Sequence, residues 1–529
     1  MKKFFIIFIF FICLFFNFLF SEEEKKFKPF VVATEYSNLQ EAVDSLPDGG
    51  TVYLPAGTYV LTEPLNLTGR TTISKSKEFP YGGGFIRLVG EGINKTTIFG
   101  KTKGKPVIDM TFTSYSEISN LTIRSGGSDG ANVGILLGRE KQDGGGGGAD
   151  LFQNLAIEMN NTDAKACVYS MGSEVNRFIN CHFYIYSHNG TCFYFTPTNP
   201  LEIKSSYIPT AGGGCNTELI FYGCTFQNRG TNSVGLRIEG FASDVRIYGG
   251  YFSNQGFSAI YLDGTRSCLD NVGIYDVRIE GEWGKHCVYT KGYTRGIKIK
   301  GGAWVSGYGE VIYQEPAGTW DGSKGECYGW KVEDISVSLS IGHAQKEKNG
   351  KIVYWKDFEQ DIPFYDKRGD DFYTLLRFYN LRNSSIDIRQ FSVPVFWEPE
   401  TKEKTKFYYS QNVKAVVVEN LSEGNTFYLP RKDLLLLKNE KTKMGNKLIV
   451  FDDDGKYTLW HQKGELISPE EEGNYRVYFL GRSFLNLTPQ PVKFIKNPKN
   501  GDVAIDNTGG KIRLAVFDGE KWIFFEPVK

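Results

Sequence analysis

The sequence has no excess of charge of either sign, since Lys and Arg together number 61 and so do Asp and Glu. A chain without net charge creates no field that would draw nucleic acid or an anionic membrane, which argues against a nucleic-acid partner. Histidines are few: His182, His188, His286, His343 and His461. No CxxC pair or Cys/His cluster is present, so we predict no zinc site. The glycines at 144–148 lack the following Lys-Ser/Thr of a phosphate-binding loop, so we assign them no nucleotide role.

Charge is also almost missing from the first 21 residues. Lys2 and Lys3 precede an apolar run from Phe4 to Phe20, after which the charged residues EEEKK begin. This pattern predicts that residues 1–21 are an export signal, and therefore a secreted or cell-surface protein. The run is longer than most cleavable signals, so an uncleaved anchor is the alternative, and we expect membrane contact only there.

What the sequence does contain is a repeat. One short pattern occurs as VGLRIEG (234–240), SAIYLDG (258–264), HCVYTKG (286–292) and EVIYQEP (310–316). Its central apolar residues, Leu236, Ile260, Val288 and Ile312, are 24, 28 and 24 residues apart. Such a period indicates a solenoid, and the alternation of apolar and polar residues indicates strands with one buried face. Because one copy cannot bury its own apolar face, the copies should stack as rungs around a continuous core.

A second column of positions supports the same architecture. The segments SNLTI (119–123), QNLAI (153–157), INCHF (179–183), YGCTF (222–226), YGGYF (248–252), YDVRI (275–279), KGGAW (300–304) and EDISV (333–337) align with one another. Their second positions are Asn120, Asn154, Asn180, Gly223, Gly249, Asp276, Gly301 and Asp334. Gly, Asn and Asp accept a left-handed backbone, so each rung should make the same sharp bend there.

The cysteines fall into similar columns. Nine are present, and Cys13 lies in the apolar run, which leaves eight in the rest of the chain. Cys167 and Cys192 should lie on adjacent rungs, as should Cys181 and Cys224, about 4.8 Å apart. If the exported protein is oxidised, these are the expected disulfides; stacked reduced thiols are the alternative.

The N-terminal part predicts how the stack begins. Leu39, Ala42, Val43 and Leu46 have the spacing of a short amphipathic helix that ends at Pro47. The strand TVYLP and the turn PAGT then follow, at 51–55 and 55–58. A helix over the open end of a solenoid would cap its first, unpaired rung.

This opening, with the later LVGEG (88–92), resembles the pectate-lyase-like superfamily, in particular its branch of rhamnogalacturonase, epimerase-like and tailspike proteins. The resemblance covers roughly residues 30–339. It implies an all-β fold, a right-handed parallel β-helix with an N-terminal capping helix, and a polysaccharide as partner. We expect the β-helix at 30–440, with its clearest rungs at 118–339, and a small β-rich module at 441–529 with a hairpin turn at Asp518-Gly519.

The outward positions of the repeat carry the candidate site. One column holds Arg237, Tyr261, Tyr289 and Tyr313, and the column two residues further holds Glu239, Asp263, Lys291 and Glu315. We expect the first column, with Trp320 from a neighbouring loop, to bind sugar rings, and the second to be catalytic. The alternative is a plain polar strand face with a surface ion ladder.

Two reactions fit the carboxylates at this stage. Asp263 and Glu315 should lie two rungs apart, which side-chain reach could bring into the range of inverting glycoside hydrolases. A lyase would instead need a base and a cation beside a uronate, for which Lys291, Arg237 or a bound Ca²⁺ could serve. No cofactor is certain. Because Lys291 between two acids should hold both ionised, the proton donor could lie elsewhere, at Glu310 or Glu282.

The motifs of the better-known family members are mostly missing. Asn161-Thr162-Asp163 matches the first polygalacturonase motif in its letters, but the next two motifs are absent at the expected rungs. His286, beside the acidic column, is the first candidate for a histidine mechanism, and a structural role is the alternative. Two hypotheses remain: a secreted polysaccharide hydrolase or lyase, whose substrate could contain uronate, and a non-catalytic glycan-binding or structural β-helix.

Overall fold

The structure is a computed structural model. It describes residues 30–46, 49–67, 86–111, 113–138, 148–171, 173, 175–196, 218–240, 242–281, 284–306, 309–319, 325–339, 346–348, 351–353, 373–388, 390–392, 413–429, 434–438, 446–451, 457–461, 503–506, 513–517 and 520–525. Residues 1–21 lie outside this part of the chain. Within it, no helix is both long enough and apolar enough to cross a membrane.

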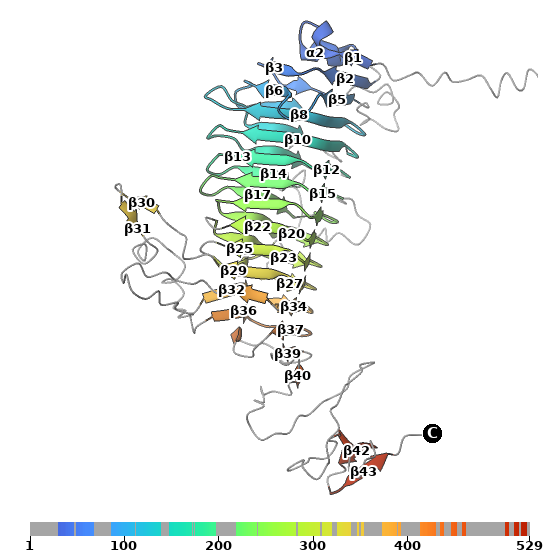
Figure 1. Ribbon diagram of the computed structural model, residues 1–529, viewed down its shortest axis with the longest axis vertical. Coiled ribbons are helices and arrows are strands. Elements are labelled where there is room, and N and C mark those ends of the chain that lie inside the picture. The colour runs from blue at the N-terminus through green and yellow to red at the C-terminus, as the bar shows by residue number, and fades with distance from the viewer. Residues whose placement is uncertain are drawn as a thin grey trace, which may run out of the picture.

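The chain winds into an elongated stack whose sides are three faces of parallel strands (Figure 1). The first face consists of β1 (Phe30–Val32), β2 (Gly50–Leu54), β5 (Ile86–Gly90), β8 (Glu117–Ser125), β10 (Leu151–Met159), β12 (Arg177–Ile179), β15 (Ile220–Tyr222), β18 (Arg246–Tyr248), β21 (Gly273–Tyr275), β24 (Lys298–Lys300), β28 (Lys331–Glu333), β34 (Ser385–Asp387), β37 (Thr426–Leu429) and β39 (Lys447–Phe451). The second face consists of β3 (Gly57–Leu61), β6 (Thr96–Gly100), the distal halves of β8 and β10, β13 (His182–Ile185), β16 (Thr225–Asn228), β19 (Tyr251–Asn254), β22 (Arg278–Gly281), β25 (Ala303–Ser306), β29 (Ser336–Leu339) and β35 (Gln390–Ser392).

The third face contains the repeat found in the sequence. Its strands are β4 (Leu65–Asn66), β7 (Pro106–Asp109), β9 (Val133–Leu137), β11 (Ala166–Met171), β14 (Thr191–Thr196), β17 (Val234–Glu239), β20 (Ser258–Asp270), β23 (His286–Arg295), β26 (Ile312–Glu315), β32 (Tyr373–Phe378), β36 (Val413–Glu419) and β38 (Leu435–Lys438). The short strands β27 (Cys327–Tyr328) and β33 (Leu381–Arg382) extend it beside β23. The predicted parallel β-helix is confirmed.

Stacking of like residues fills the core. The central apolar residues of the four repeats pair in register and are fully buried. Phe178 stacks between Phe152 and Phe221, with ring centroids 4.5 and 5.2 Å away. Each rung therefore gains its buried surface from the rungs above and below it, as a solenoid requires.

The predicted column of sharp bends is also confirmed. All eight positions from Asn120 to Asp334 have a left-handed backbone, with φ between 50° and 73°. They join the first face to the second, and Asn154 donates a side-chain hydrogen bond of 3.0 Å to Asn120 on the preceding rung. The bend repeats because each rung supplies a residue that tolerates this conformation.

The two ends of the stack differ. The helix α2 (Leu39–Asp44) follows the short 3-10 turn η1 (Ala33–Glu35), and the Asn38 side chain caps it by accepting from the Glu41 amide. Leu39, Ala42 and Val43 are buried, and α2 lies at the N-terminal end of the stack (Figure 1). A helix therefore forms where the sequence predicts one; its role as a cap stays a prediction.

At the other end, β39 pairs in parallel with β37, so the first face continues beyond residue 440. β40 (Tyr457–His461) then runs antiparallel to β39. A separate antiparallel sheet contains β41 (Val503–Asp506), β42 (Arg513–Phe517) and β43 (Trp522–Phe525), and β30 (Lys346–Lys348) pairs with β31 (Lys351–Val353). Phe517 pairs with Trp522, and the predicted turn at Asp518-Gly519 itself lies outside the described residues.

The four cysteines expected to form columns are buried thiols. Cys167 lies against Cys192, and Cys181 against Cys224. Burial raises the pKa of the Cys167 thiol well above its usual value, and the neighbouring Cys192 adds to the rise. In this structure they are therefore stacked apolar side chains, and the disulfides stay a prediction for the oxidised protein.

Candidate functional site

The two outward columns of the third face lie in the predicted register. Arg237 pairs with Tyr261, Tyr261 with Tyr289, and Tyr289 with Tyr313. In the same strands Glu239 pairs with Asp263, Asp263 with Lys291, and Lys291 with Glu315. Parallel in-register pairing places each side chain about 4.8 Å from its neighbour along the stack. The structure thus brings eight of the nine predicted site residues together. Trp320, the ninth, lies outside the described residues.

Glu239 is held by three neighbouring side chains. Its Oε1 accepts hydrogen bonds from the Tyr194 hydroxyl at 2.9 Å and from Arg237 Nη2 at 2.6 Å, and its Oε2 accepts from the Thr196 hydroxyl at 3.0 Å. The Arg237 guanidinium also lies between the rings of Tyr194 and Tyr261, 4.8 Å from each centroid. A buried carboxylate with this many partners is suited to fixing Arg237 and the tyrosines in place.

Asp263 is paired with the lysine of the next rung. Lys291 Nζ is 3.2 Å from Asp263 Oδ2. The other oxygen, Oδ1, accepts hydrogen bonds from the amide of Thr265 at 3.0 Å and from its hydroxyl at 2.5 Å. An ammonium group and two hydrogen-bond donors thus hold both oxygens of Asp263 in place.

Glu315 has the opposite environment. Burial raises the pKa of Glu315, and the negative charge of Asp263 raises it further, while Lys285 lowers it. The Tyr289 hydroxyl donates to Glu315 Oε2. We expected Lys291 to hold both acids ionised, but its ion pair is with Asp263, and the pKa of Glu315 rises. A carboxyl with a raised pKa keeps its proton to higher pH and can donate it.

The tyrosines are more enclosed than the sequence suggested. Tyr261, Tyr289 and Tyr313 expose only 9%, 7% and 9% of their surface. Their ring centroids follow one another at 5.0 and 5.7 Å, and Phe257, just before β20, packs edge-on against Tyr289 at 4.6 Å. The expectation that this column faces solvent therefore needs correction, because aromatic side chains cover it. Whether these tyrosines contact sugar stays a prediction.

A buried ionic network lies beside the tyrosines. Arg377, from β32, places Nε 3.0 Å from Glu310 Oε1 and Nη1 2.9 Å from Glu419 Oε1. The His286 Nδ1 lies 2.9 Å from the backbone oxygen of Glu310, and its ring stacks on Tyr313 at 5.1 Å. Glu310 is therefore bound to a permanent cation in the interior and is poorly suited as the proton donor. Glu282, the other candidate, lies outside the described residues.

Sequence reasoning missed Arg377. β32 pairs with β26 so that Tyr313 faces Arg377, which makes Arg377 the next member of the tyrosine column. The signal was the pair Leu376-Arg377, which matches Ile312-Tyr313 of the repeat. The extra residues that follow β29, 340–372, hid it.

Metal ligands do not gather in the described part of the chain, where no three His, Cys, Asp or Glu side chains form a cluster. Residues 197–217 and 320–324 lie outside it. Among the described side chains of this face, Asp263 and Glu315 are two carboxyl groups with different surroundings.

Several solved structures are similar to this one. The A-module of the mannuronan C-5 epimerase AlgE6 from Azotobacter vinelandii matches at 13% identity over 75% of this chain and 98% of its own, with a TM-score of 0.41. PfbA, a surface adhesin of Streptococcus pneumoniae, matches at 12% identity over 82% and 99%, with a TM-score of 0.45. The DFA-IIIase from Arthrobacter chlorophenolicus A6 matches at 10% identity over 77% and 96%, with a TM-score of 0.40.

No family model matches the sequence, and a search of curated proteins found no match either. The fold is therefore identified from the strands themselves, three faces of which pair in parallel from rung to rung. By this evidence the chain is a parallel β-helix, the architecture of the pectate-lyase-like superfamily that its sequence resembles.

Proposed function

We propose that this protein binds a polysaccharide along the third face and hydrolyses it between Asp263 and Glu315. The observation that carries this proposal is the difference between the two carboxyl groups. Asp263 is paired with Lys291, and the pKa of Glu315 is raised by burial and by Asp263. Two nearby carboxyl groups in different surroundings, one of them with a raised pKa, are a usual basis for assigning an acid and a base.

The spacing favours inversion at the anomeric carbon. Asp263 and Glu315 are separated by one strand, which puts their Cα atoms about 10 Å apart. Inverting hydrolases hold their two carboxyl groups about 6.5–9.5 Å apart to leave room for a water molecule. Retaining enzymes need about 5 Å, which is the distance of adjacent rungs.

In this reaction Glu315 gives its proton to the glycosidic oxygen as the bond from that oxygen to the anomeric carbon breaks. Asp263 takes a proton from a water molecule, whose oxygen bonds to the anomeric carbon from the opposite side. The reaction leaves Glu315 ionised and Asp263 protonated, and exchange with solvent restores both. Lys291 stabilises the Asp263 carboxylate between turnovers, and Glu239 holds Arg237 at the edge of the site.

A non-catalytic glycan binder is the second candidate, favoured by the enclosure of the tyrosine column. Phe257 and the packed rings limit the access of a sugar to Tyr261, Tyr289 and Tyr313, and Asp263 already has partners for both of its oxygens. In either case we propose that residues 1–21 direct the protein out of the cell. N-terminal sequencing of secreted protein would show whether the chain then begins after them.

The test is a product assay on neutral and uronate-containing polysaccharides. The native protein should release reducing ends without the ultraviolet absorbance of unsaturated products, whereas a lyase would produce that absorbance. Asp263→Asn should lower the rate about 10²–10⁴-fold with little change in glycan affinity. Asp129→Asn, at an exposed carboxylate paired with Lys101, is the matched control. Equal rates for Asp263→Asn and the native protein would refute the site, and no products on any glycan would favour the binder.

A further inference from the structure

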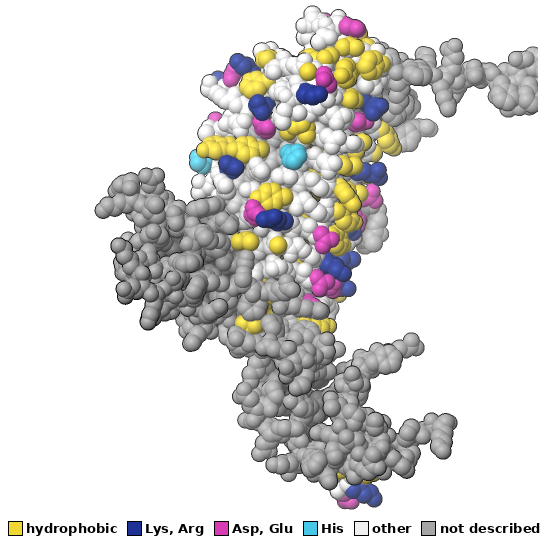
Figure 2. All heavy atoms as spheres, viewed as in Figure 1, with side chains coloured by type: hydrophobic (Ala, Val, Ile, Leu, Met, Phe, Trp, Pro, Cys, Tyr) yellow, Lys and Arg dark blue, Asp and Glu magenta, His cyan; other side chains and the backbone are white. Residues whose placement is uncertain are grey.

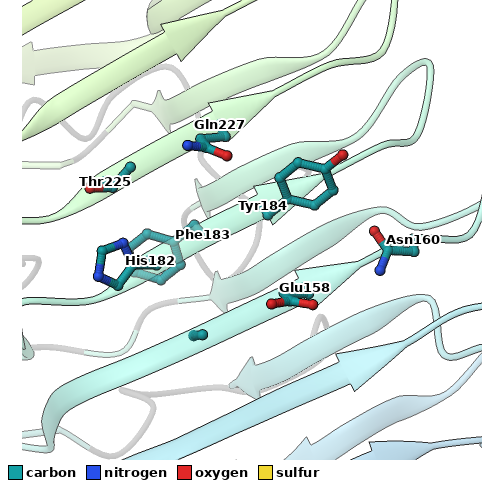
Figure 3. A pocket seen from close by; sticks show the side chains of 8 residues that line it. Glu158, Asn160, His182, Phe183, Tyr184, Thr225 and Gln227 are labelled. Atoms are coloured by element: carbon teal, nitrogen blue, oxygen red, sulfur yellow. The ribbon is translucent and has the colours of Figure 1, made fainter. Parts of the chain in front are cut away.

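The second face carries a hollow that lies outside the candidate site. It has a volume of about 400 Å³ and opens above β10, β13 and β16. Figure 3 shows the side chains that line it, with Glu158, Tyr184 and Gln227 on three successive strands and His182 and Thr225 beside them. A volume of this size is within the range of small-molecule sites.

Hydrogen-bonding groups without net charge dominate this hollow. Gln227 and Asn160 contribute amides, and Thr225 and Tyr184 contribute hydroxyls. The Glu158 carboxylate is bound to Arg124, with Oε2 2.6 Å from Nε, so its charge is balanced within the face. The Arg229 guanidinium lies over the Tyr184 ring, 5.5 Å from its centroid. Amides and hydroxyls that both donate and accept match the hydroxyl groups of a neutral sugar.

An exposed tyrosine column runs along the neighbouring edge of the first face. Tyr222, Tyr248 and Tyr275 occupy the same position on β15, β18 and β21, directly before the left-handed residue. Tyr222 and Tyr248 expose 59% and 37% of their surface, and successive ring centroids are 5.8 and 5.3 Å apart. Figure 2 shows hydrophobic side chains following one another down this edge of the stack, with both signs of charge interspersed.

The bend between the two faces is open on the rung of Tyr248. There Gly249 has no heavy atom within 4 Å of the place a Cβ would take. On the rung of the hollow the chain passes from Tyr222 through Gly223 and Cys224 to Thr225, and a Cβ at Gly223 would lie 2.9 Å from Asn180 Oδ1. A ligand chain can therefore round the bend at Gly249, one rung beyond the hollow, without meeting a side chain there.

From these observations we propose a second glycan-binding surface, formed by the tyrosine column and the hollow, that holds a strand of neutral sugars. The rings of Tyr222 and Tyr248 contact the C–H faces of the sugars, and Gln227 and Thr225 bond to their hydroxyls. This surface is separate from Asp263 and Glu315, so it would anchor the polysaccharide whether or not the third face cleaves it.

Gel electrophoresis through immobilised neutral α- and β-glucans tests the proposal on the full chain. The native protein should be retarded by at least one of them, equally at low and high salt. The double variant Tyr222→Ala/Tyr248→Ala should bind about tenfold more weakly, and Gln227→Ala should also lose affinity. Phe30→Ala removes an exposed ring from the same face at the N-terminal end of the stack and should bind normally.

Three results would overturn the proposal: no retardation by any neutral glucan, equal retardation of the native protein and the tyrosine variant, or retardation by a polyuronate alone that high salt removes. Asp263→Asn separates this proposal from the hydrolase. It should be retarded like the native protein, so that loss of cleavage and loss of this surface are independent outcomes.

Discussion

The molecule has two tyrosine columns, one on the third face and one on the first, and they differ in what lies over them. Tyr261, Tyr289 and Tyr313 pack against Phe257, while Tyr222 and Tyr248 are exposed at an edge, each directly before a glycine. Both columns arise from the same in-register stacking of identical residues. Stacking alone therefore does not decide whether an aromatic column stabilises the fold or binds a ligand. The neighbouring residues decide it.

The third face gains its special chemistry from this enclosure. Burial of Glu315 raises its pKa, whereas a carboxyl on the open first face keeps its contact with water and would not feel that effect. Substitutions on the third face, each matched with one on the first face, therefore test the comparison directly.

The largest effect is expected at Glu315. Glu315→Gln removes the proton donor and should lower kcat about 10²–10⁴-fold. Because the pKa of Glu315 is raised, its acid form survives to higher pH and is lost as pH rises through that value. The native protein should thus lose activity on the alkaline side, and the variant should lack this limb. Glu117→Gln, at a carboxylate paired with Arg87 on the first face, is the control. An unchanged alkaline limb in Glu315→Gln would assign the acid to another group.

The tyrosine columns should differ in stability. Tyr289→Ala removes a buried ring that contacts Tyr261, Tyr313 and Phe257. It should lower the free energy of unfolding by about 3–5 kcal/mol. Tyr248→Ala removes an exposed ring and should cost about 0.5–1 kcal/mol. Urea unfolding of the two variants gives both values. Equal costs would contradict the difference in packing between the two columns.

The glycines of the bend offer a smaller, internal comparison. Gly249 and Gly250 both have positive φ, but a Cβ on Gly250 would lie 2.3 Å from the Cys224 carbonyl oxygen. Gly249→Ala should lower the free energy of unfolding by about 1–2 kcal/mol, because alanine disfavours the left-handed conformation. Gly250→Ala should add about 1–3 kcal/mol for overpacking. If Gly249→Ala proved the more damaging, the edge beside Tyr248 would not be open.

Period and residue type were enough to predict the rungs. The left-handed residues from Asn120 to Asp334 and the register of Asp263, Lys291 and Glu315 follow from the sequence spacing, because a solenoid converts spacing directly into contact. The order of Asp263, Lys291 and Glu315 along the stack could therefore be predicted from the sequence.

The burial of the side chains on the third face could not be predicted from the sequence in the same way. It depends on residues distant in sequence, such as Arg377, which joins the tyrosine column from beyond a long insertion. The raised pKa of Glu315 depends on burial and on the negative charge of Asp263, which are properties of the assembled face. Tyr222, Tyr248 and Tyr275 were visible as the first letters of three aligned segments, but their exposure was not.

The most direct test of the central claim is a crystal structure of Asp263→Asn with a bound oligosaccharide of the polysaccharide that the native protein cleaves. The claim predicts sugar rings across β20, β23 and β26, with the scissile oxygen in hydrogen-bonding distance of the Glu315 carboxyl. It also predicts a water molecule between residue 263 and the anomeric carbon. Sugar bound only at the tyrosine column and the hollow, with the third face empty, would contradict it.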